Sequence, residues 1–334
     1  QKDKIQLYQN QVFVTDNVEG IVPEFLTMLR GVIDSPDIPL NVSRSYLQAD
    51  GAVKKISSYI TKKVADKLKS LFNNDREDFE AKWNDIKIVI EYGMLSEEKF
   101  FEKAEAFALY PTVDGTYYTY DELYNKIKVK QTNKDDKLVI LYASNADEQH
   151  SYIEAAKAKD YEVLLLDSPI VSHLIQKLEG SKENISFARV DADHIDKLTQ
   201  KEDTVISKLS EEQKTTLDEH LKAVISSEKF VVQLEAMDSN AAPFMITQPE
   251  FMRRMKEMQQ TGGGGMFGMG NMPEMYNLVV NTNSELVNEI LNTKTAKKRE
   301  RLINQSLDLA QLSQGLLKGE ALTNFIKRSY EMIK

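Results

Sequence analysis

Three short apolar runs decide the fold of the middle of this chain: KLVILYA (137–143), YEVLLLD (161–167) and ISFARVD (185–191). Two stretches with helical character, at 148–159 and 169–179, separate them. This order of strand, helix, strand, helix and strand predicts a small parallel sheet with right-handed crossovers. We therefore expect residues 112–192 to form one compact α/β subdomain.

The chain before this subdomain begins with a strand pattern. Apolar residues alternate over 4–15, which predicts a strand or a hairpin half-buried on a sheet. Pro23 suits the first position of a helix that Gly31 would end. The prolines and the Asp and Asn residues of 34–44 predict an ordered loop.

Three consecutive amphipathic helices are expected next. The first covers 53–71, and the second carries apolar residues from Phe79 onward until Gly93 stops it. Ser96 would cap the third, whose apolar residues continue to Ala108. Helices without intervening strands predict a helical block that ends near residue 111.

Two capping-box patterns mark helix starts further along the chain: Thr119 with Glu122, and Ser210 with Gln213. We place a domain boundary at the second. The remainder is expected to hold strands at 229–236 and 275–281, an extended piece at 243–247, and helices at about 249–260, 284–292, 296–317 and 320–333.

These elements predict a multi-domain protein of mixed α/β and α+β class. A partial sheet, a helical block and the small parallel subdomain precede a final α+β domain. The expected domains are 1–74, 75–111, 112–209 and 210–334.

The amino-acid composition argues against several classes of partner and of chemistry. The 334 residues carry 43 Lys and Arg against 52 Asp and Glu, a formal charge of −9, which argues against nucleic-acid and anionic-membrane partners. No run reaches the ~18 apolar residues of a membrane span, and the absence of cysteine excludes disulfides and thiolate chemistry. The chain starts at Gln1 without a signal-like leader, so we expect a piece of a cytoplasmic protein.

Open parallel sheets often bind nucleotides beyond the carboxyl ends of their strands. After the first strand, however, the chain reads ASNADEQ (143–149), without the glycine that lets a phosphate approach a helix N-terminus, and no GxxxxGK occurs. The four histidines are scattered, so no metal site is expected. A structural subdomain is the stronger prediction, and an enzyme that binds a nucleotide or another small molecule on 112–192 is the alternative.

Two apolar features point to partners. Seven of the twelve methionines fall within 249–275, where a helix with Phe251, Met255 and Met258 on one face would either offer a flexible surface to varied partners or face the core. The last two helices carry more apolar side chains than a short domain buries, which predicts pairing with a second copy. The residues expected at that dimer interface are Leu316, Leu322, Phe325, Ile326, Tyr330 and Ile333.

The stretch LYQNQVFVTDNVEGIVPEFLTMLRGVIDSPDIPLNVSRSYLQ (7–48) closely resembles the middle domain of the heat-shock protein 90 chaperone family. Matching pieces include Val12-Phe13-Val14, Arg30-Gly31-Val32, Pro39-Leu40-Asn41 and Ser43-Arg44. The likeness continues through the helical block and the small α/β unit, weakens over 193–290, and returns in the terminal helices. The chain as a whole resembles the bacterial type of that family.

This resemblance implies a dimeric, ATP-dependent molecular chaperone that binds unfolded or partly folded client proteins. Arg44 and Gln48 share one face of an expected helix, and composition alone would make Arg44 an ordinary surface residue. By the resemblance, Arg44 matches the arginine that reaches the ATP γ-phosphate, and Gln48 the glutamine that acts beside it. Phe13 matches the apolar contact to the ATP-binding domain. The amphipathic helix implicated in client binding corresponds to Phe251, Met255 and Met258.

By the resemblance, we expect this sequence to correspond to the middle and C-terminal domains, without the ATP-binding domain. We therefore expect no cofactor and no ATPase activity for this chain alone, and ATP and Mg in the full-length protein. A purely structural scaffold dimer is a third interpretation, which binding of unfolded proteins would distinguish from a chaperone.

Overall fold

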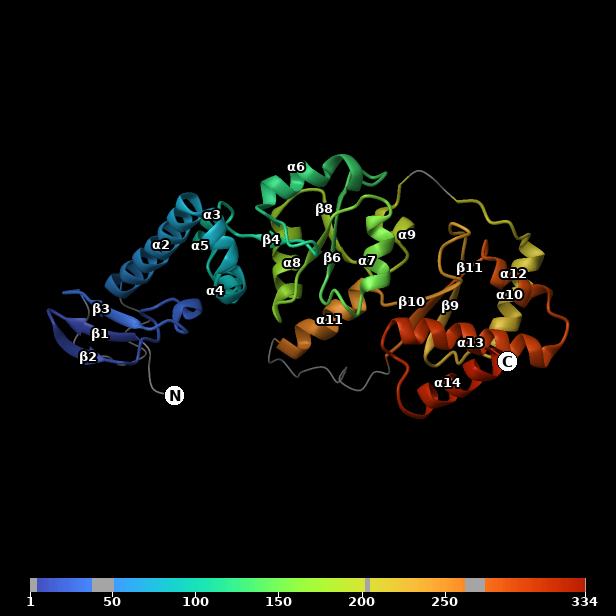
Figure 1. The fold of residues 1–334 in the computed structure, drawn as a ribbon. Coiled ribbons are helices and arrows are strands. Elements are labelled where there is room, and N and C mark those ends of the chain that lie inside the picture. Colours follow the sequence, from blue (N-terminus) through green and yellow to red (C-terminus); the bar gives the residue numbers. More distant parts are fainter. Residues whose placement is uncertain (1–4, 38–50, 202–204, 262–273, 334) are drawn as a thin grey trace. The chain divides into compact units, whose positions relative to one another are not determined.

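The computed structural model describes residues 5–37, 51–201, 205–261 and 274–333. By its internal contacts the chain divides into two compact units. Figure 1 shows the helices and strands along the chain. The first unit comprises Gln1–Pro111, Gly115–Tyr124 and Ser168–Gly180, and the second comprises Thr112–Asp114, Asn125–Asp167 and Ser181–Lys334. The four domains expected from the sequence stay a prediction.

The first unit opens with a sheet in the strand order β2–β1–β3. Its strands are β1 (Ile5–Gln9), β2 (Val12–Thr15) and β3 (Gly31–Asp34). Asn10 and Gln11 join β1 to β2 with positive φ angles of 49° and 69°, as in a tight two-residue hairpin turn. The expected hairpin is confirmed, and β3 runs parallel to β1.

The prediction of a helix from Pro23 to Gly31 is wrong. Helical structure is confined to the short 3-10 turn η1 (Glu24–Leu26), and Gly31 begins a strand instead of ending a helix. Phe25 and Leu26 are buried, so the apolar cluster does pack inward. The next residues enter the sheet because β3 finds its partner in β1, a pairing between distant segments that local periodicity does not reveal.

Helices make up most of the described remainder of the first unit: α2 (Gly51–Asn74), α3 (Arg76–Ala81), α4 (Trp83–Ser96) and α5 (Glu98–Ala104). The second expected helix is divided at Lys82, and α4 continues through Gly93. Ser96 ends α4 instead of capping α5, and its hydroxyl donates to the carbonyl of Tyr92 at 2.9 Å. Gly93 does not end α4, because it makes room for the buried rings of Phe25 and Phe100, which lie where a Cβ would be.

The second unit contains the predicted parallel sheet, in the order β7–β6–β8. Its strands are β6 (Leu138–Ala143), β7 (Val163–Leu165) and β8 (Ile185–Arg189). Every residue of β6 is buried, as expected for the central strand of a parallel sheet. Helix α7 (His150–Lys157) contacts β7 and α9 (Ile195–Thr199). Helix α8 (Val171–Ser181), which belongs to the first unit up to Gly180, falls where the sequence predicts it.

Both predicted capping boxes are present. They start α6 (Tyr120–Gln131) and α10 (Glu211–Lys222). Thr119 N donates to the Glu122 carboxylate at 3.2 Å and Glu122 N donates to Thr119 Oγ1 at 3.4 Å. The short strands β4 (Tyr110–Pro111) and β5 (Tyr117–Tyr118) pair just before α6.

A second sheet, β10–β11–β9, organises the C-terminal part. The elements here are β9 (Phe230–Glu235), β10 (Phe244–Thr247), α11 (Glu250–Thr261), β11 (Tyr276–Asn281), α12 (Glu285–Asn292), α13 (Ala296–Ser313) and α14 (Gly319–Ile333). Leu217 of α10, Ile290 of α12 and Ile303 of α13 share one core with the sheet residues Ile246 and Leu278. The mixed α/β and α+β class is confirmed. Within the described part of the chain, none of the helices combines the length and the apolar character needed to cross a membrane.

Candidate functional site

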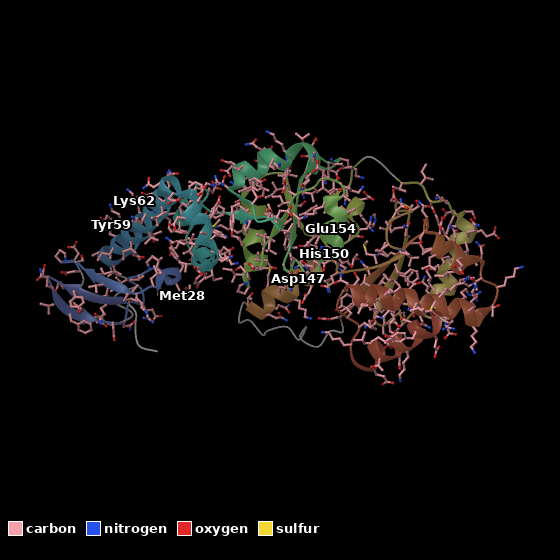
Figure 2. All side chains as sticks on the ribbon, in the orientation of Figure 1. Met28, Tyr59, Lys62, Asp147, His150 and Glu154 are labelled. Carbon is pink, nitrogen blue, oxygen red and sulfur yellow. The ribbon has the colours of Figure 1, made fainter. Side chains whose placement is uncertain are left out.

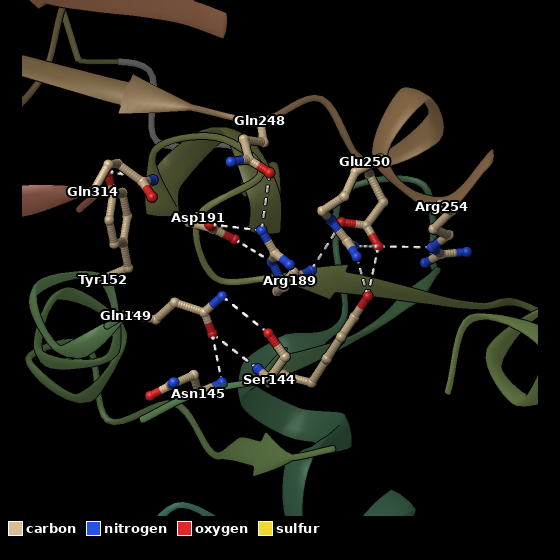
Figure 3. A network of polar contacts seen from close by, with 12 residues as sticks. Ser144, Asn145, Gln149, Tyr152, Arg189, Asp191, Gln248, Glu250, Arg254 and Gln314 are labelled. Atoms are coloured by element: carbon tan, nitrogen blue, oxygen red, sulfur yellow. Dashed lines mark hydrogen bonds and ion pairs between the residues drawn. The ribbon is translucent and has the colours of Figure 1, made fainter. Parts of the chain in front are cut away.

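Three elements of the second unit meet at the carboxyl end of the parallel sheet: β6, β8 and the first turn of α11 (Figure 3). Tyr142, near the end of β6, donates its hydroxyl hydrogen to Glu250 Oε1 at 3.0 Å. The backbone N–H of Arg189, the last residue of β8, donates to Glu250 Oε2 at 3.1 Å. One carboxylate therefore joins the first residue of α11 to two strands that are far apart in the sequence.

Two arginines of α11 complete the surroundings of this carboxylate. Arg253 Nη2 lies 2.6 Å and Arg254 Nε 2.7 Å from Glu250 Oε1. Arg253 also donates to the Tyr142 hydroxyl at 2.7 Å and to Glu257 Oε1 at 2.7 Å, and Arg254 donates to the carbonyl of Phe187 in β8 at 2.6 Å. The helix is thus tied to the sheet by charged side chains.

The charges set the protonation of this cluster. Burial raises the pKa of Glu250, but the positive charges of Arg253 and Arg254 outweigh burial and hold the pKa below its usual value. Burial and the Glu250 charge together raise the pKa of Tyr142. At neutral pH the cluster therefore contains a carboxylate anion, a neutral phenol and paired guanidinium groups.

A second ion pair lies beside the first. Arg189 binds the Asp191 carboxylate through both Nε (2.6 Å) and Nη2 (2.9 Å), and Arg189 Nη2 also donates to Gln248 Oε1 at 3.1 Å. Both residues of the pair are buried. Because Gln248 N donates to the carbonyl of Asp191 at 3.0 Å, the segment just before α11 is fixed to the same edge of the sheet.

In an open parallel sheet a phosphate binds in the loop after a strand, and here that is the loop after β6. The side chain of Gln149 accepts hydrogen bonds there from Ser144 N at 2.8 Å and Asn145 N at 3.3 Å (Figure 3). These backbone N–H groups are the donors that a phosphate would need, and the chain itself already occupies them. This geometry does not favour a nucleotide-binding enzyme on 112–192.

The apolar side chains of α11 lie on the opposite side of the helix. Phe251 is 71% exposed and Met252 is 54% exposed, while Met255 and Met258 are half-buried. This side of α11 is thus exposed or half-buried, and the binding of partners to it stays a prediction. Within α11 the buried residue is Arg253, not an apolar side chain.

Phe13 is the predicted contact residue of the first unit. Phe13 is half exposed on β2, and its ring packs edge-on against Tyr8 at 5.6 Å between ring centroids. The β1 register puts Tyr8, Phe13 and Val32 on one face of the first sheet. Arg44 and Gln48 lie outside the described residues.

The predicted dimer residues divide by exposure. Ile326, Tyr330 and Ile333 are exposed on α14, and Leu316 and Leu322 are half-buried. Phe325 is buried within the chain.

The histidines do not gather. His150 and Glu154 lie on the exposed side of α7, with 4.0 Å between His150 Nε2 and Glu154 Oε1 (Figure 2). Among the described residues, no group of three or more His, Asp or Glu side chains is placed to hold a metal ion. A pocket of about 690 Å³ lies between α7, the segment 237–246 and α13, and its lining is mostly apolar.

Sequence reasoning missed the charged cluster at the base of α11. Glu250, Arg253, Arg254 and Glu257 recur at spacings of three and four, the spacing by which one helix face is recognised. Arg189, inside an otherwise apolar run, was a further signal, since a charge in a buried strand needs a partner.

Comparison with known proteins identifies the family. The model of the Hsp90 protein family matches residues 1–334. The chaperone protein HtpG of Bacteroides thetaiotaomicron is 45% identical over 399 aligned positions, which cover 99% of this chain and 58% of that protein. HtpG of Porphyromonas gingivalis is 41% identical, with 100% of this chain and 58% of that protein covered. HtpG of Alcanivorax borkumensis is 29% identical, with 94% and 49% covered.

The chain belongs to the Hsp90 family of chaperones. Within that family it is of the bacterial HtpG type. It spans a little over half the length of the Bacteroides and Porphyromonas relatives. The alignment with the Bacteroides protein is longer than this chain, so that relative carries additional residues inside the matched region.

Proposed function

We propose that this chain is the client-binding and dimerising part of an HtpG-type chaperone. The observation that carries the proposal is the apolar surface of α11, where Phe251 and Met252 are exposed and Met255 and Met258 are half-buried. Flexible methionine side chains fit many apolar partners, which suits a protein that binds varied unfolded chains. An exposed apolar strip is otherwise unfavourable on a protein surface.

Replacing both Met255 and Met258 by Ser tests this function. Binding of a permanently unfolded protein, such as reduced and alkylated α-lactalbumin, should weaken about tenfold, which corresponds to 1.4 kcal/mol. The melting temperature should stay nearly fixed, because these side chains contribute little to the core. Val129→Ser is the matched control, since Val129 is an exposed apolar residue on α6.

Two outcomes would reject the proposed client surface. Unchanged binding in the Met255→Ser, Met258→Ser variant would leave a scaffold dimer as the better interpretation. A large drop in melting temperature with unchanged binding would show that the methionines serve the core.

The proposal extends to ATP only through a partner domain. In the full-length protein, with ATP and Mg held by an N-terminal domain, Arg44 would stabilise the charge that develops on the transferred phosphoryl group, and Gln48 would act beside it. The face of the first sheet that carries Tyr8, Phe13 and Val32, of which Phe13 and Val32 are exposed, would contact that domain.

Arg44→Ala in the full-length protein tests this part. ATP turnover should fall at least ~10-fold, while ATP affinity changes much less because the nucleotide pocket lies in another domain. Arg30→Ala is the control, because Arg30 is an exposed arginine of the first unit, and it should leave turnover unchanged. Normal turnover in Arg44→Ala would remove the phosphate-contacting role.

A further inference from the structure

Helix α11 is docked with its charged side toward the sheet. Glu250, Arg253, Arg254 and Glu257 form one face, which we call the charged face, and Phe251, Met252, Met255 and Met258 form the apolar face. At about 100° per residue the centres of these faces lie on roughly opposite sides of the helix. A globular helix normally buries its apolar stripe. Here Arg253 is 8% exposed and Phe251 is 71% exposed, so the usual arrangement is reversed.

The contacts of the charged face explain how the reversal is held. Glu250 is contacted from β6 by the Tyr142 hydroxyl and from β8 by the Arg189 N–H, at 3.0 and 3.1 Å. Its own helix adds Arg253 and Arg254 at 2.6 and 2.7 Å. Four donors from three elements therefore converge on one carboxylate.

The rest of the charged face follows the same pattern. Arg254 donates to the carbonyl of Phe187 in β8, and Glu257 lies 2.7 Å from Arg253 Nη1 and 3.6 Å from Arg189 Nη1. Glu250 is the residue common to the sheet contacts and to the intrahelical pairs. Without it, two buried or half-buried guanidinium groups lose a carboxylate and the hydroxyl of Tyr142 loses its acceptor.

The ion pairs of the charged face fix the orientation of α11 more than they add to its stability. Buried ion pairs contribute little net stability compared with well-packed apolar residues, because removing charges from water is costly. Their directional bonds do fix one geometry, since each guanidinium donates along set directions. If apolar contacts held α11 to the sheet instead, the apolar side chains that it now exposes would be buried.

We propose that Glu250 is a positioning residue for client binding, which fixes the charged face of α11 to the ends of β6 and β8 and thereby keeps the apolar face presented to clients. This inference rests on the proposed function of α11. A helix held in its binding orientation loses less conformational entropy when a client binds, so it binds more tightly than a loosened one.

The variant Glu250→Gln tests the proposal with little change in size. Gln keeps an acceptor oxygen but lacks the charge that pairs with Arg253 and Arg254. Amide hydrogen exchange over residues 251–261 should speed up, while exchange in β6 and β8 stays slow. The dissociation constant for reduced and alkylated α-lactalbumin should rise about tenfold. Glu285→Gln is the matched control, because Glu285 is an exposed glutamate at the first position of α12.

A mutant cycle separates positioning from a general structural effect. If Glu250 acts through the apolar face, adding Glu250→Gln to the Met255→Ser, Met258→Ser variant should weaken binding little further. Independent, additive losses would overturn the positioning role. So would faster exchange in α11 without weaker binding, or unchanged exchange and binding.

A further outcome concerns the proposed function itself. If the methionine variant binds the unfolded protein normally, α11 is not the client surface, and the role of Glu250 in client binding fails with it. If the methionine variant loses binding and Glu250→Gln does not, the client surface stands and the positioning role alone is rejected.

Discussion

Gly93 shows what a single residue decides inside the first unit. It lies within α4, where a Cβ would come within 2.7 Å of a Phe100 ring carbon and 2.8 Å of a Phe25 ring carbon. Both rings are fully buried and pack against each other at 4.7 Å between centroids. Glycine is present here because the rings need the space. Glycine lowers the stability of a helix, and the packing of the two rings offsets that loss.

Gly93→Ala should destabilise the first unit by about 1–3 kcal/mol, because the added methyl group overpacks the two rings. Urea unfolding followed by Trp83 fluorescence measures this, since Trp83 is the sole tryptophan of the chain and is buried in the first unit. Gly180→Ala is the control, for no atom lies within 4 Å of the new Cβ and α8 should gain up to about 1 kcal/mol. Equal effects of the two variants would contradict the packing argument.

His194 is a buried histidine whose two ring nitrogens have no hydrogen-bond partner among the described residues. Burial lowers its pKa, against the opposite pull of Asp193, Glu235 and Asp196, and Lys197 also acts to lower it. The folded state therefore resists protonation more than the unfolded state does. The free energy of unfolding therefore has its full value, as far as His194 is concerned, above about pH 6.5, the ordinary histidine pKa. It falls as the pH drops below that value.

His194→Gln should flatten this loss of stability between pH 7.5 and pH 5.5. The measurement is the urea midpoint by circular dichroism at both pH values, with Trp83 fluorescence as the reporter of the first unit. Some slope should persist, because burial also lowers the pKa of His220. His150→Gln, on the exposed side of α7, should keep the wild-type slope; an unchanged slope in His194→Gln would show that other groups cause it.

At the scale of elements, the turn between β11 and α12 holds two other segments in place. Asn283 Oδ1 accepts from Lys208 N at 2.7 Å, and Asn283 Nδ2 donates to the carbonyls of Ile206 and Met237, both at 3.0 Å. Asn281 Nδ2 donates to the carbonyl of Asp238 at 2.7 Å. The buried side-chain amides of Asn281 and Asn283 thus bond to backbone groups of the segments 206–208 and 237–238.

Asn283→Ala should destabilise the second unit by about 3 kcal/mol, because three backbone groups lose their partner, and one of these bonds is buried and the other two are partly buried. Circular dichroism in urea should show the loss while the Trp83 transition stays in place. Asn292→Ala, which removes one exposed bond to the carbonyl of Asn288, should cost much less. Comparable losses from both variants would mean that the Asn283 bonds are not special.

At the scale of the whole molecule, exposed apolar side chains gather on the last two helices. Leu309 and Leu312 are exposed on α13, and Ile326, Tyr330 and Ile333 on α14. Within the chain, α14 is held to α13 by Arg328 and Ser329, which both bond to Gln305. The helix pair is therefore formed in one copy, and these exposed apolar side chains remain for the proposed dimer.

Ile326→Glu combined with Ile333→Glu should convert the proposed dimer to a monomer, since two charges would face each other across an apolar contact. Light scattering at micromolar concentration measures the mass. These changes leave the buried Phe325 and the Gln305 bonds intact, whereas deletion of 320–334 would remove them too. Val129→Glu on α6 should not change the mass, and a dimeric double variant would place the interface elsewhere.

The sequence by itself determined most elements and their order. Alternating or continuous apolar runs predicted β6, β7, β8, β9 and β11, and the two capping boxes correctly marked the starts of α6 and α10. These features depend on a few neighbouring residues, and so they are visible in one sequence. The matching stretch 7–48 was enough for the family as well.

Tertiary structure decided how those elements are used. Strand β3 exists because β1 lies beside it, and α4 continues through Gly93 because Phe25 and Phe100 fill the space there. The same holds for α11, whose sequence offers two faces with helical spacing. The buried polar ends of β6 and β8 select the charged one, because Glu250 finds its donors in Tyr142 and Arg189 only after distant segments have come together.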